Sequence, residues 1–126
     1  MTTCPFCSIA PDKIIAQNAQ TYTVRDTLPV SPGHTLIVPK RHIAGIFEAT
    51  KDEVSALWDA VQQARNGLLK EFSPDGFNIG FNDGLASGQT ILHLHLHIIP
   101  RYKGDMPDPR GGIRWIFPEK AKYWKD

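Results

Sequence analysis

Three histidines recur at every second position in one short stretch: His93, His95 and His97, within residues 91–100. Successive side chains of an extended strand point to opposite faces. A strand over residues 91–100 would therefore place the three imidazoles on one face. The opposite face would carry the aliphatic residues Leu92, Leu94, Leu96 and Ile98. We predict that the aliphatic face packs in the core and that the histidine face carries the chemistry.

Imidazoles in this pattern could serve three purposes. They could be exposed without a role, although three histidines in phase are improbable in a chain that holds five. A His-x-His pair could ligate a catalytic metal, which would require a further ligand and an open position for water. One imidazole could instead attack phosphorus while its neighbours hold the charged group that is transferred. We favour this third use.

The loop before the histidines supports phosphate chemistry. It is small, uncharged and rich in hydrogen-bond donors, and its candidate residues are Asn82, Gly84, Gly88, Gln89 and Thr90. Backbone and side-chain donors of this type bind phosphate oxygens. Glycines alone could merely shape a turn, but beside three histidines the loop indicates a phosphate-binding site.

Two cysteines, Cys4 and Cys7, lie three positions apart near the start of the chain. This spacing suits a metal site or a redox pair. Redox dithiols usually follow a strand and open a helix, and only three residues precede Cys4. A tetrahedral zinc site would need two more ligands, for which His42 and His93 are available. Zinc ligation is favoured, and free thiols and a redox dithiol remain as alternatives.

Overall composition describes an ordinary globular chain. It has 126 residues, of which 41% are hydrophobic and 21% charged, so we expect a single domain over residues 1–126. A formal net charge of +1 argues against a nucleic-acid partner and favours a small molecule. The sequence shows no secretory signal and no segment long enough to span a membrane, so a cytoplasmic location is expected.

Hydrophobic periodicity predicts an α+β fold in which an antiparallel sheet of about five strands packs against one long helix. The strands are expected at residues 14–16 and 22–25, which form a hairpin, and at residues 34–39, 77–81 and 91–100. The helix is expected from Thr50 to Phe72, with Thr50 and Glu53 as a capping box. Its apolar stripe, predicted to lie on the sheet, consists of Val54, Leu57, Trp58, Val61, Leu68, Leu69 and Phe72.

The segment from Arg101 to Asp126 is rich in glycine and proline and should be irregular. Its apolar residues make a free tail improbable. They are Ile113, Trp115, Ile116 and Phe117. We expect this segment to cover another surface, such as a neighbouring subunit.

The sequence G-Q-T-I-L-H-L-H-L-H-I-I-P-R resembles the signature of the histidine triad family, in which three histidines alternate with apolar residues. Asp26, the Pro32-Gly33-His34 run and the Pro39-Lys40-Arg41-His42 run also resemble family positions. The resemblance covers most of the chain and weakens after Arg101. It implies a HIT-like fold and a nucleotide hydrolase or nucleotidyl transferase that acts at an α-phosphate. The substrate would be a dinucleoside polyphosphate or a nucleoside phosphoramidate.

The resemblance also implies individual roles. His95 would be the nucleophile that forms a covalent nucleotidyl intermediate, with its other ring nitrogen held by the backbone carbonyl of His93. His97 would assist the leaving group, and His34 would support the triad. Substrate contacts would come from Asp26 at the ribose and from Asn82, Gly88, Gln89 and Thr90 around the phosphate.

Related proteins with an N-terminal cysteine pair imply a structural zinc held by Cys4, Cys7, His42 and His93. Such a zinc would orient His93 and, through it, His95. The resemblance further implies a homodimer and no catalytic cofactor. Two other functions remain open: a metal-dependent hydrolase that uses the histidines as ligands, and a nucleotide-binding sensor without turnover.

Overall fold

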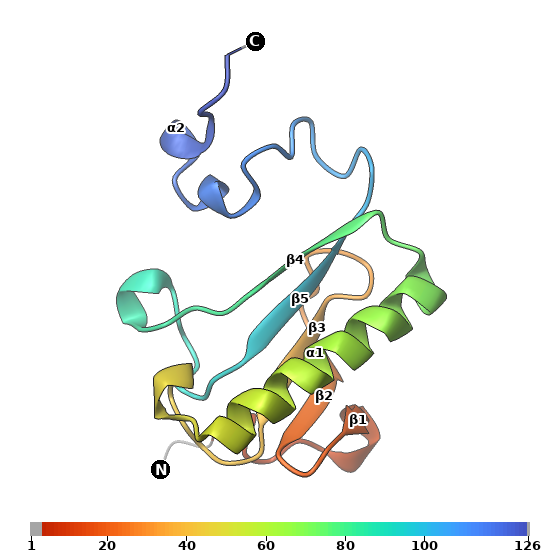
Figure 1. Cartoon of the computed structure of the whole chain (residues 1–126), viewed down its shortest axis with the longest axis vertical. Coiled ribbons are helices and arrows are strands. Elements are labelled where there is room, and N and C mark those ends of the chain that lie inside the picture. The colour runs from red at the N-terminus through yellow and green to blue at the C-terminus, as the bar shows by residue number, and fades with distance from the viewer. Residues whose placement is uncertain (1–3, 126) are drawn as a thin grey trace.

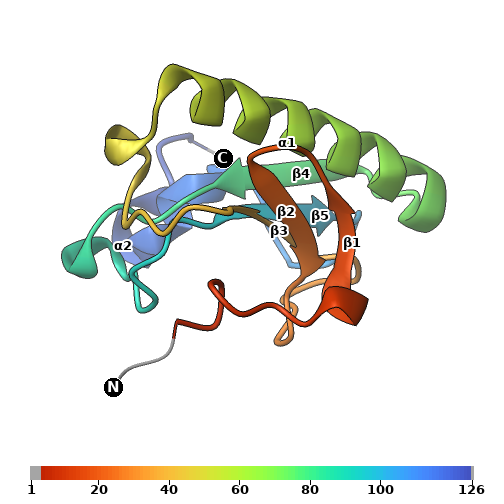
Figure 2. The same cartoon turned by 90° about the horizontal axis from the view of Figure 1, so that it is seen from below.

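The computed structural model describes residues 4–125; residues 1–3 and 126 of the predicted domain lie outside the described part. Within it, five antiparallel strands form one sheet in the order β1-β2-β3-β5-β4, and one long helix covers one face of that sheet (Figures 1 and 2). The strands are β1 (Ile14–Gln17), β2 (Thr21–Arg25), β3 (Thr35–Pro39), β4 (Gly76–Gly80) and β5 (Leu96–Arg101). The predicted α+β class and the β1-β2 hairpin are confirmed.

Helix α1 (Lys51–Phe72) begins where the capping box predicted it. The Thr50 hydroxyl accepts from the Glu53 amide at 3.1 Å, and the Glu53 carboxylate accepts from the Thr50 amide at 2.8 Å. Both amides would otherwise lack a partner at the helix start. The helix ends at Ser73, whose φ of +52° is left-handed and breaks the helical path.

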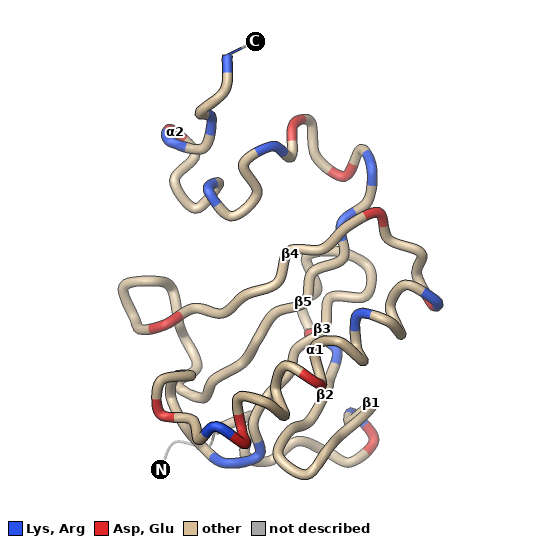
Figure 3. Tube along the Cα trace, viewed as in Figure 1, with Lys and Arg blue, Asp and Glu red and all other residues tan. Residues whose placement is uncertain are grey.

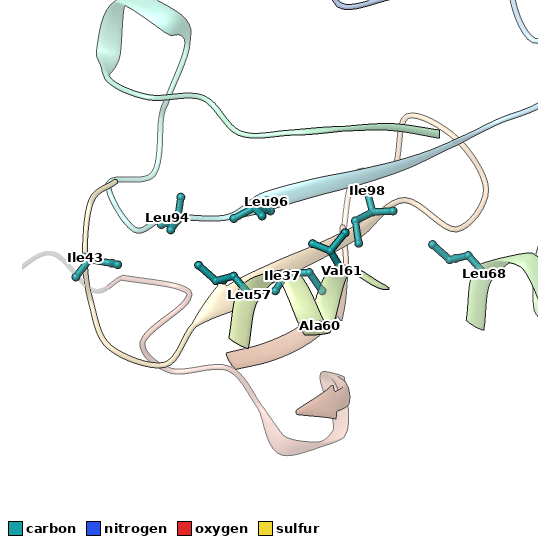
Figure 4. Packing of buried hydrophobic residues seen from close by; sticks show 9 residues of the cluster. All are labelled: Ile37, Ile43, Leu57, Ala60, Val61, Leu68, Leu94, Leu96 and Ile98. Atoms are coloured by element: carbon teal, nitrogen blue, oxygen red, sulfur yellow. The ribbon is translucent and has the colours of Figure 1, made fainter. Parts of the chain in front are cut away.

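The hydrophobic core lies between the sheet and α1, where Ile37 and Ile98 of the central strands meet Leu57 and Val61 of the helix (Figure 4). Part of the predicted helical stripe is absent from this core. Trp58 is 58% exposed, and Val54 and Leu69 are also exposed. A helix on a sheet buries only the stripe that faces the sheet, and Trp58, one residue after the buried Leu57, is turned by about 100° from it.

Strand β5 begins five residues later than predicted. Its ladder with β3 starts where Leu96 pairs with Ile37, and residues 91–95 are irregular. Beyond that point β3 ends at Pro39, which has no amide hydrogen to donate to a ladder. Leu94 and Leu96 still point into the core, but Leu92 is 49% exposed, so the predicted apolar face starts at Leu94.

Short helical turns occupy several loops: η1 (Pro11–Lys13), η2 (Ile46–Glu48) and η3 (Leu85–Ser87). Residues 102–125 leave β5 and lie beyond the β4 edge, with η4 (Gly112–Ile116) and α2 (Pro118–Ala121) (Figure 1). Basic residues recur along this segment (Figure 3). Ile113, Ile116 and Phe117 are about 70% exposed, so they cover no surface within the described chain. No helix among the described residues is long and apolar enough to cross a membrane.

Candidate active site

The N-terminal segment crosses the sheet face opposite α1 (Figure 2). Residues of this segment line a cleft of about 930 Å³. Its walls come from that segment, from the loop between β2 and β3, and from the stretch around the triad. Of the site residues that the sequence predicts, those whose side chains line it are Asp26, His34, Asn82, Thr90, His95 and His97. The structure thus brings together most of the residues that the sequence predicted as a site.

His95 occupies the centre of the triad, and its tautomer follows from its hydrogen bond. Its Nδ1 lies 2.9 Å from the His93 carbonyl oxygen, as the resemblance implied. A carbonyl only accepts, so Nδ1 donates its hydrogen and Nε2 of neutral His95 keeps a lone pair. The Phe6 ring lies against this imidazole, with 5.0 Å between ring centroids.

His97 belongs to a chain of hydrogen bonds that also orders its tautomer. The Val30 amide donates to Nδ1 of His34 at 3.1 Å, so the hydrogen of neutral His34 is on Nε2. This Nε2 lies 2.9 Å from Nδ1 of His97 and 3.5 Å from an Asp26 carboxylate oxygen. His34 therefore donates to Nδ1 of His97, which leaves the hydrogen of His97 on Nε2, as a donor.

Electrostatics keep these two imidazoles neutral. Burial lowers the pKa of His34 below its ordinary value, against the opposing effect of Asp26. Burial also lowers the pKa of His97, and the neighbouring imidazoles of His95 and His34 lower it further. Both residues consequently remain neutral at pH values where a free histidine would be protonated.

Local backbone geometry delivers His34 to this position. Gly33, which precedes it, has a φ of +88°, a region that L-residues with side chains rarely adopt. A Cβ on Gly33 would also lie only 2.9 Å from Leu68 of α1. The turn can therefore pack against the helix and start β3 with His34 facing His97.

His93 faces away from the cleft and into a second cluster. It is fully buried, and its Nε2 donates to the Pro39 carbonyl at 2.8 Å. Its Nδ1 lies 3.3 Å from Sγ of Cys4, 3.6 Å from Sγ of Cys7 and 3.1 Å from Nδ1 of His42. Burial is the main cause that lowers the pKa of His93, which favours a neutral ring with a lone pair on Nδ1.

These four side chains fit a tetrahedral zinc ion. Their ligand atoms all lie within 4.8 Å of one another, and the closest pairs are 3.1–3.6 Å apart. Zinc bonds of about 2.0–2.3 Å in a tetrahedron separate ligand atoms by about 3.3–3.8 Å. The Pro39 carbonyl would hold His93 from behind, as outer hydrogen bonds commonly hold metal-binding histidines.

The phosphate-loop predictions have mixed outcomes. Asn82, Gly88 and Thr90 line the cleft, whereas Gln89 is buried and outside its lining. The Gln89 side chain accepts from the Gly84 amide and donates to the carbonyls of Ala44 and Ile91. The amide group of the Gln89 side chain therefore holds the loop in place, and a phosphate contact by Gln89 stays a prediction.

Phe6 is a site residue that the sequence reasoning missed. Its ring contacts both His93 and His95, and it lines the cleft. The available signal was an aromatic residue between two cysteines, because a metal bound to both cysteines would fix whatever side chain lies between them.

Fold and site together define a class: an α+β domain in which a histidine triad leads into strand β5 beside a cleft on the sheet face opposite α1. Residues 8–104 match the family model of the HIT domain, and the chain belongs to this family. The segment after residue 104 lies outside the match.

Several known proteins are similar to this chain. Adenylylsulfatase HINT3 of Arabidopsis thaliana is 37% identical over 106 residues, which cover 81% of this chain and 54% of that protein. The bis(5'-nucleosyl)-tetraphosphatase [asymmetrical] of Schizosaccharomyces pombe is 39% identical over 80 residues, covering 64% and 44%. A zinc-bound histidine triad family protein from Mycobacterium smegmatis has a TM-score of 0.75 and 31% identity, covering 94% of each chain.

Proposed function

We propose that this protein is a nucleotide hydrolase or nucleotidyl transferase that acts at the α-phosphate of a dinucleoside polyphosphate or nucleoside phosphoramidate. The single observation that carries the proposal is the hydrogen bond from Nδ1 of His95 to the His93 carbonyl, which leaves a lone pair on Nε2. An imidazole held in one tautomer beside a donor-lined cleft suits nucleophilic catalysis on phosphorus. The name of the Schizosaccharomyces pombe relative, a bis(5'-nucleosyl)-tetraphosphatase, supports a dinucleoside polyphosphate substrate, and the name adenylylsulfatase supports action on an adenylyl group.

In the first step, Nε2 of His95 attacks the α-phosphorus, and the bond from phosphorus to the leaving group breaks. The leaving group takes the electron pair of that bond, the N–H proton on Nε2 of His97 hydrogen-bonds to it and stabilises its charge, and solvent supplies any proton that the leaving group gains. The hydrogen bonds from Val30 to His34 and from His34 to Nδ1 of His97 keep the proton of His97 on Nε2. Donors at Asn82, Gly88 and Thr90 would stabilise the charge on the phosphoryl oxygens.

In the second step, water attacks the phosphorus and the bond from phosphorus to nitrogen breaks. The electron pair returns to Nε2 of His95, and the proton of the attacking water is released to solvent. Asp26 would contact the ribose at the edge of the cleft, although one of its oxygens already accepts from the Leu28 amide at 2.9 Å.

A metal-dependent hydrolase is the second candidate, because Asp26, His34 and His97 also place ligand atoms within 4.8 Å of one another. The hydrogen-bond chain accounts for this grouping more simply. Two nitrogens 2.9 Å apart, one of them a donor, need no ion between them. The alternative in which neighbouring triad histidines ligate one metal has less support, since His93 faces the cysteines while His97 faces His34.

The decisive experiment is to trap the intermediate. The protein is mixed with diadenosine polyphosphate or adenosine phosphoramidate and quenched rapidly, and its peptides are analysed by mass spectrometry. We expect AMP release and an adenylyl group on His95, both lost in His95→Ala. Leu92→Ala, an exposed residue of the same stretch outside the cleft lining, serves as the matched control and should keep both.

The outcomes separate the candidate functions. Full turnover in His95→Ala would overturn the proposal. Turnover without an adduct, together with metal that persists in a Cys4→Ser, Cys7→Ser variant, would favour the metal-dependent hydrolase. Tight binding of AMP without turnover of either substrate would favour a sensor.

Assembly, metal content and location belong to the same proposal. We propose a homodimer, which the exposed Ile113, Ile116 and Phe117 of the C-terminal segment support as an uncovered apolar surface. A structural zinc at the cysteine–histidine cluster is supported by the ligand geometry. The cytoplasmic location stays a prediction, which the two unpaired cysteines favour.

A further inference from the structure

His93 lies in both parts of the site at once: its imidazole belongs to the cysteine–histidine cluster, and its backbone carbonyl binds His95. We propose that His93 and Phe6 are positioning residues that make the reactive tautomer of His95 depend on metal binding at the cluster. The inference rests on the proposed function, because it concerns the nucleophile of that reaction. It adds that metal occupancy regulates activity without metal contact to the substrate.

The first link runs through His93. One ring nitrogen donates to the Pro39 carbonyl at 2.8 Å, and the other faces Cys4, Cys7 and His42. A cation bound at Nδ1 would leave the ring with both nitrogens held, so it could no longer rotate. A fixed side chain restrains its own backbone, and the His93 carbonyl is the group that accepts from Nδ1 of His95 at 2.9 Å.

The second link runs through Phe6, which lies between the two cysteines. Its ring contacts the His95 ring at 5.0 Å and the His93 ring at 5.8 Å between centroids. The loop that carries Phe6 contains one backbone hydrogen bond, from the Cys7 amide to the Cys4 carbonyl at 3.1 Å. Metal bonds to both cysteines would close this loop and hold the Phe6 ring against the nucleophile.

Secondary structure alone restrains residues 91–95 only weakly. His93 and His95 precede the start of β5 at Leu96, so they lack the ladder that orders His97 opposite Leu36. One backbone hydrogen bond, from the Leu94 amide to the Ile43 carbonyl at 2.7 Å, anchors the stretch. His97 has in addition its bond to His34, whereas the ordering of His95 depends on a carbonyl that belongs to the cluster.

The experiment measures the His95 tautomer directly. The full-length chain, labelled with ¹⁵N-histidine and free of nucleotide, is compared by two-bond ¹H–¹⁵N correlation before and after zinc removal and after zinc addition. With zinc, His95 should show a hydrogen on Nδ1 alone; without zinc, it should show a mixture of tautomers. The tautomer of His97, held by His34, should stay constant and serves as the internal reference.

Kinetics provide the second measurement. On zinc removal, kcat should fall about tenfold, the lower end of the effect of outer-shell groups, with little change in KM, and zinc addition should restore it. Cys7→Ser, which removes a ligand without altering His93 or Phe6, should reproduce the metal-free state. Phe6→Leu, which keeps all four ligands but removes the aromatic contact, should retain zinc and show a smaller fall in kcat.

A single His95 tautomer and an unchanged kcat in folded, zinc-free protein would overturn the inference. Should zinc removal unfold the chain, exchange of zinc for the larger cadmium in the folded protein provides the test. The His95 Nδ1 resonance should then shift more than the His34 resonances, and an equal or smaller shift would overturn the inference. Failure of the proposed function would give a different result from these two outcomes. The His95 tautomer would still depend on zinc, but the zinc-loaded protein would release no AMP.

Discussion

His93 and His97, the two histidines beside His95, lie in different surroundings and have different roles. We call the surroundings of His93 the metal flank and those of His97 the His97 flank. On one flank, His93 is fully buried among Cys4, Cys7 and His42, and the lone pairs of all four converge on one point. On the other, His97 is half-buried beside His34, and donors alternate with acceptors along a chain that ends in the cleft. A cluster of metal-ligating atoms suits a cation, whereas alternating donors and acceptors suit the orientation of one hydrogen-bond donor. The neighbours, more than the histidine itself, decide the chemistry.

The strongest test of this contrast is His97→Ala, which should lower kcat by about 10²–10³-fold, because the leaving group loses the hydrogen bond that stabilises its charge. Zinc content should be unchanged, since His97 is not part of the metal cluster. Assays should compare an AMP ester that has a good leaving group with one that has a poor leaving group. An equal loss on both substrates would contradict a role of His97 at the leaving group.

A smaller effect is expected at His34, which acts through His97. His34→Ala should reduce kcat by about 10–100-fold, because the tautomer of His97 is no longer ordered. His34→Gln keeps an N–H donor at the end of the side chain and should recover part of the activity. If His34→Gln were as slow as His34→Ala while both kept their fold by circular dichroism, hydrogen-bond donation to His97 would not be the function of His34.

On the metal flank, Cys4→Ser with Cys7→Ser should abolish zinc binding, from about one equivalent per chain to none. The wild-type protein and His97→Ala serve as controls that retain the metal. Inductively coupled plasma analysis measures the zinc, and thermal unfolding should show a lower Tm because the N-terminal segment loses its anchor. Unchanged metal content in the double variant would place the metal elsewhere.

The pH dependence of the His97 flank can be measured on its own imidazoles. The pKa values of His34 and His97 are lowered, so both stay neutral as the pH falls below the ordinary histidine value of 6.5. We expect the NMR resonances of both rings in nucleotide-free protein to titrate with midpoints below pH 6.5. A midpoint above pH 6.5 for either ring would contradict this.

The smallest effect concerns the support of the metal flank. Arg41, adjacent to His42, bonds the buried Glu53 carboxylate of α1 at 2.7 Å, and this pairing lowers the pKa of Glu53 to about 2. A carboxyl group whose pKa is lower in the folded than in the unfolded chain stabilises the fold above pH 4.5. This stabilisation is lost as the pH falls toward 2. Glu53→Gln should therefore cost about 2 kcal/mol at pH 7.

Denaturant unfolding measures this cost. The difference between wild type and Glu53→Gln should shrink as the pH falls from 4.5 toward 2, where the wild-type carboxyl is increasingly protonated. Glu71→Gln, at an exposed ion pair with Arg25, is the matched control and should change stability little at any pH. A pH-independent difference for Glu53→Gln would attribute its cost to packing.

Local rules recovered much of the fold. The capping box placed the start of α1 at Thr50, because its two reciprocal hydrogen bonds involve residues only three apart. The β1-β2 hairpin and the end of β3 at Pro39 could also be predicted from neighbouring residues in the sequence. Exposure of Trp58 was not predictable, because the width of the buried stripe depends on how the helix lies on the sheet. The internal bonds of Gln89 depend on Ala44, forty-five residues away.

The sequence by itself determined the types and phase of the reactive groups: three alternating histidines, a cysteine pair and a donor-rich loop. Only the tertiary structure decided how the three imidazoles differ. Pro39 ends its strand and turns its carbonyl to His93, the cysteines meet that ring from the N-terminus, and His34 reaches His97 from β3. A tautomer depends on which partner each ring nitrogen meets, and those partners come from distant parts of the chain.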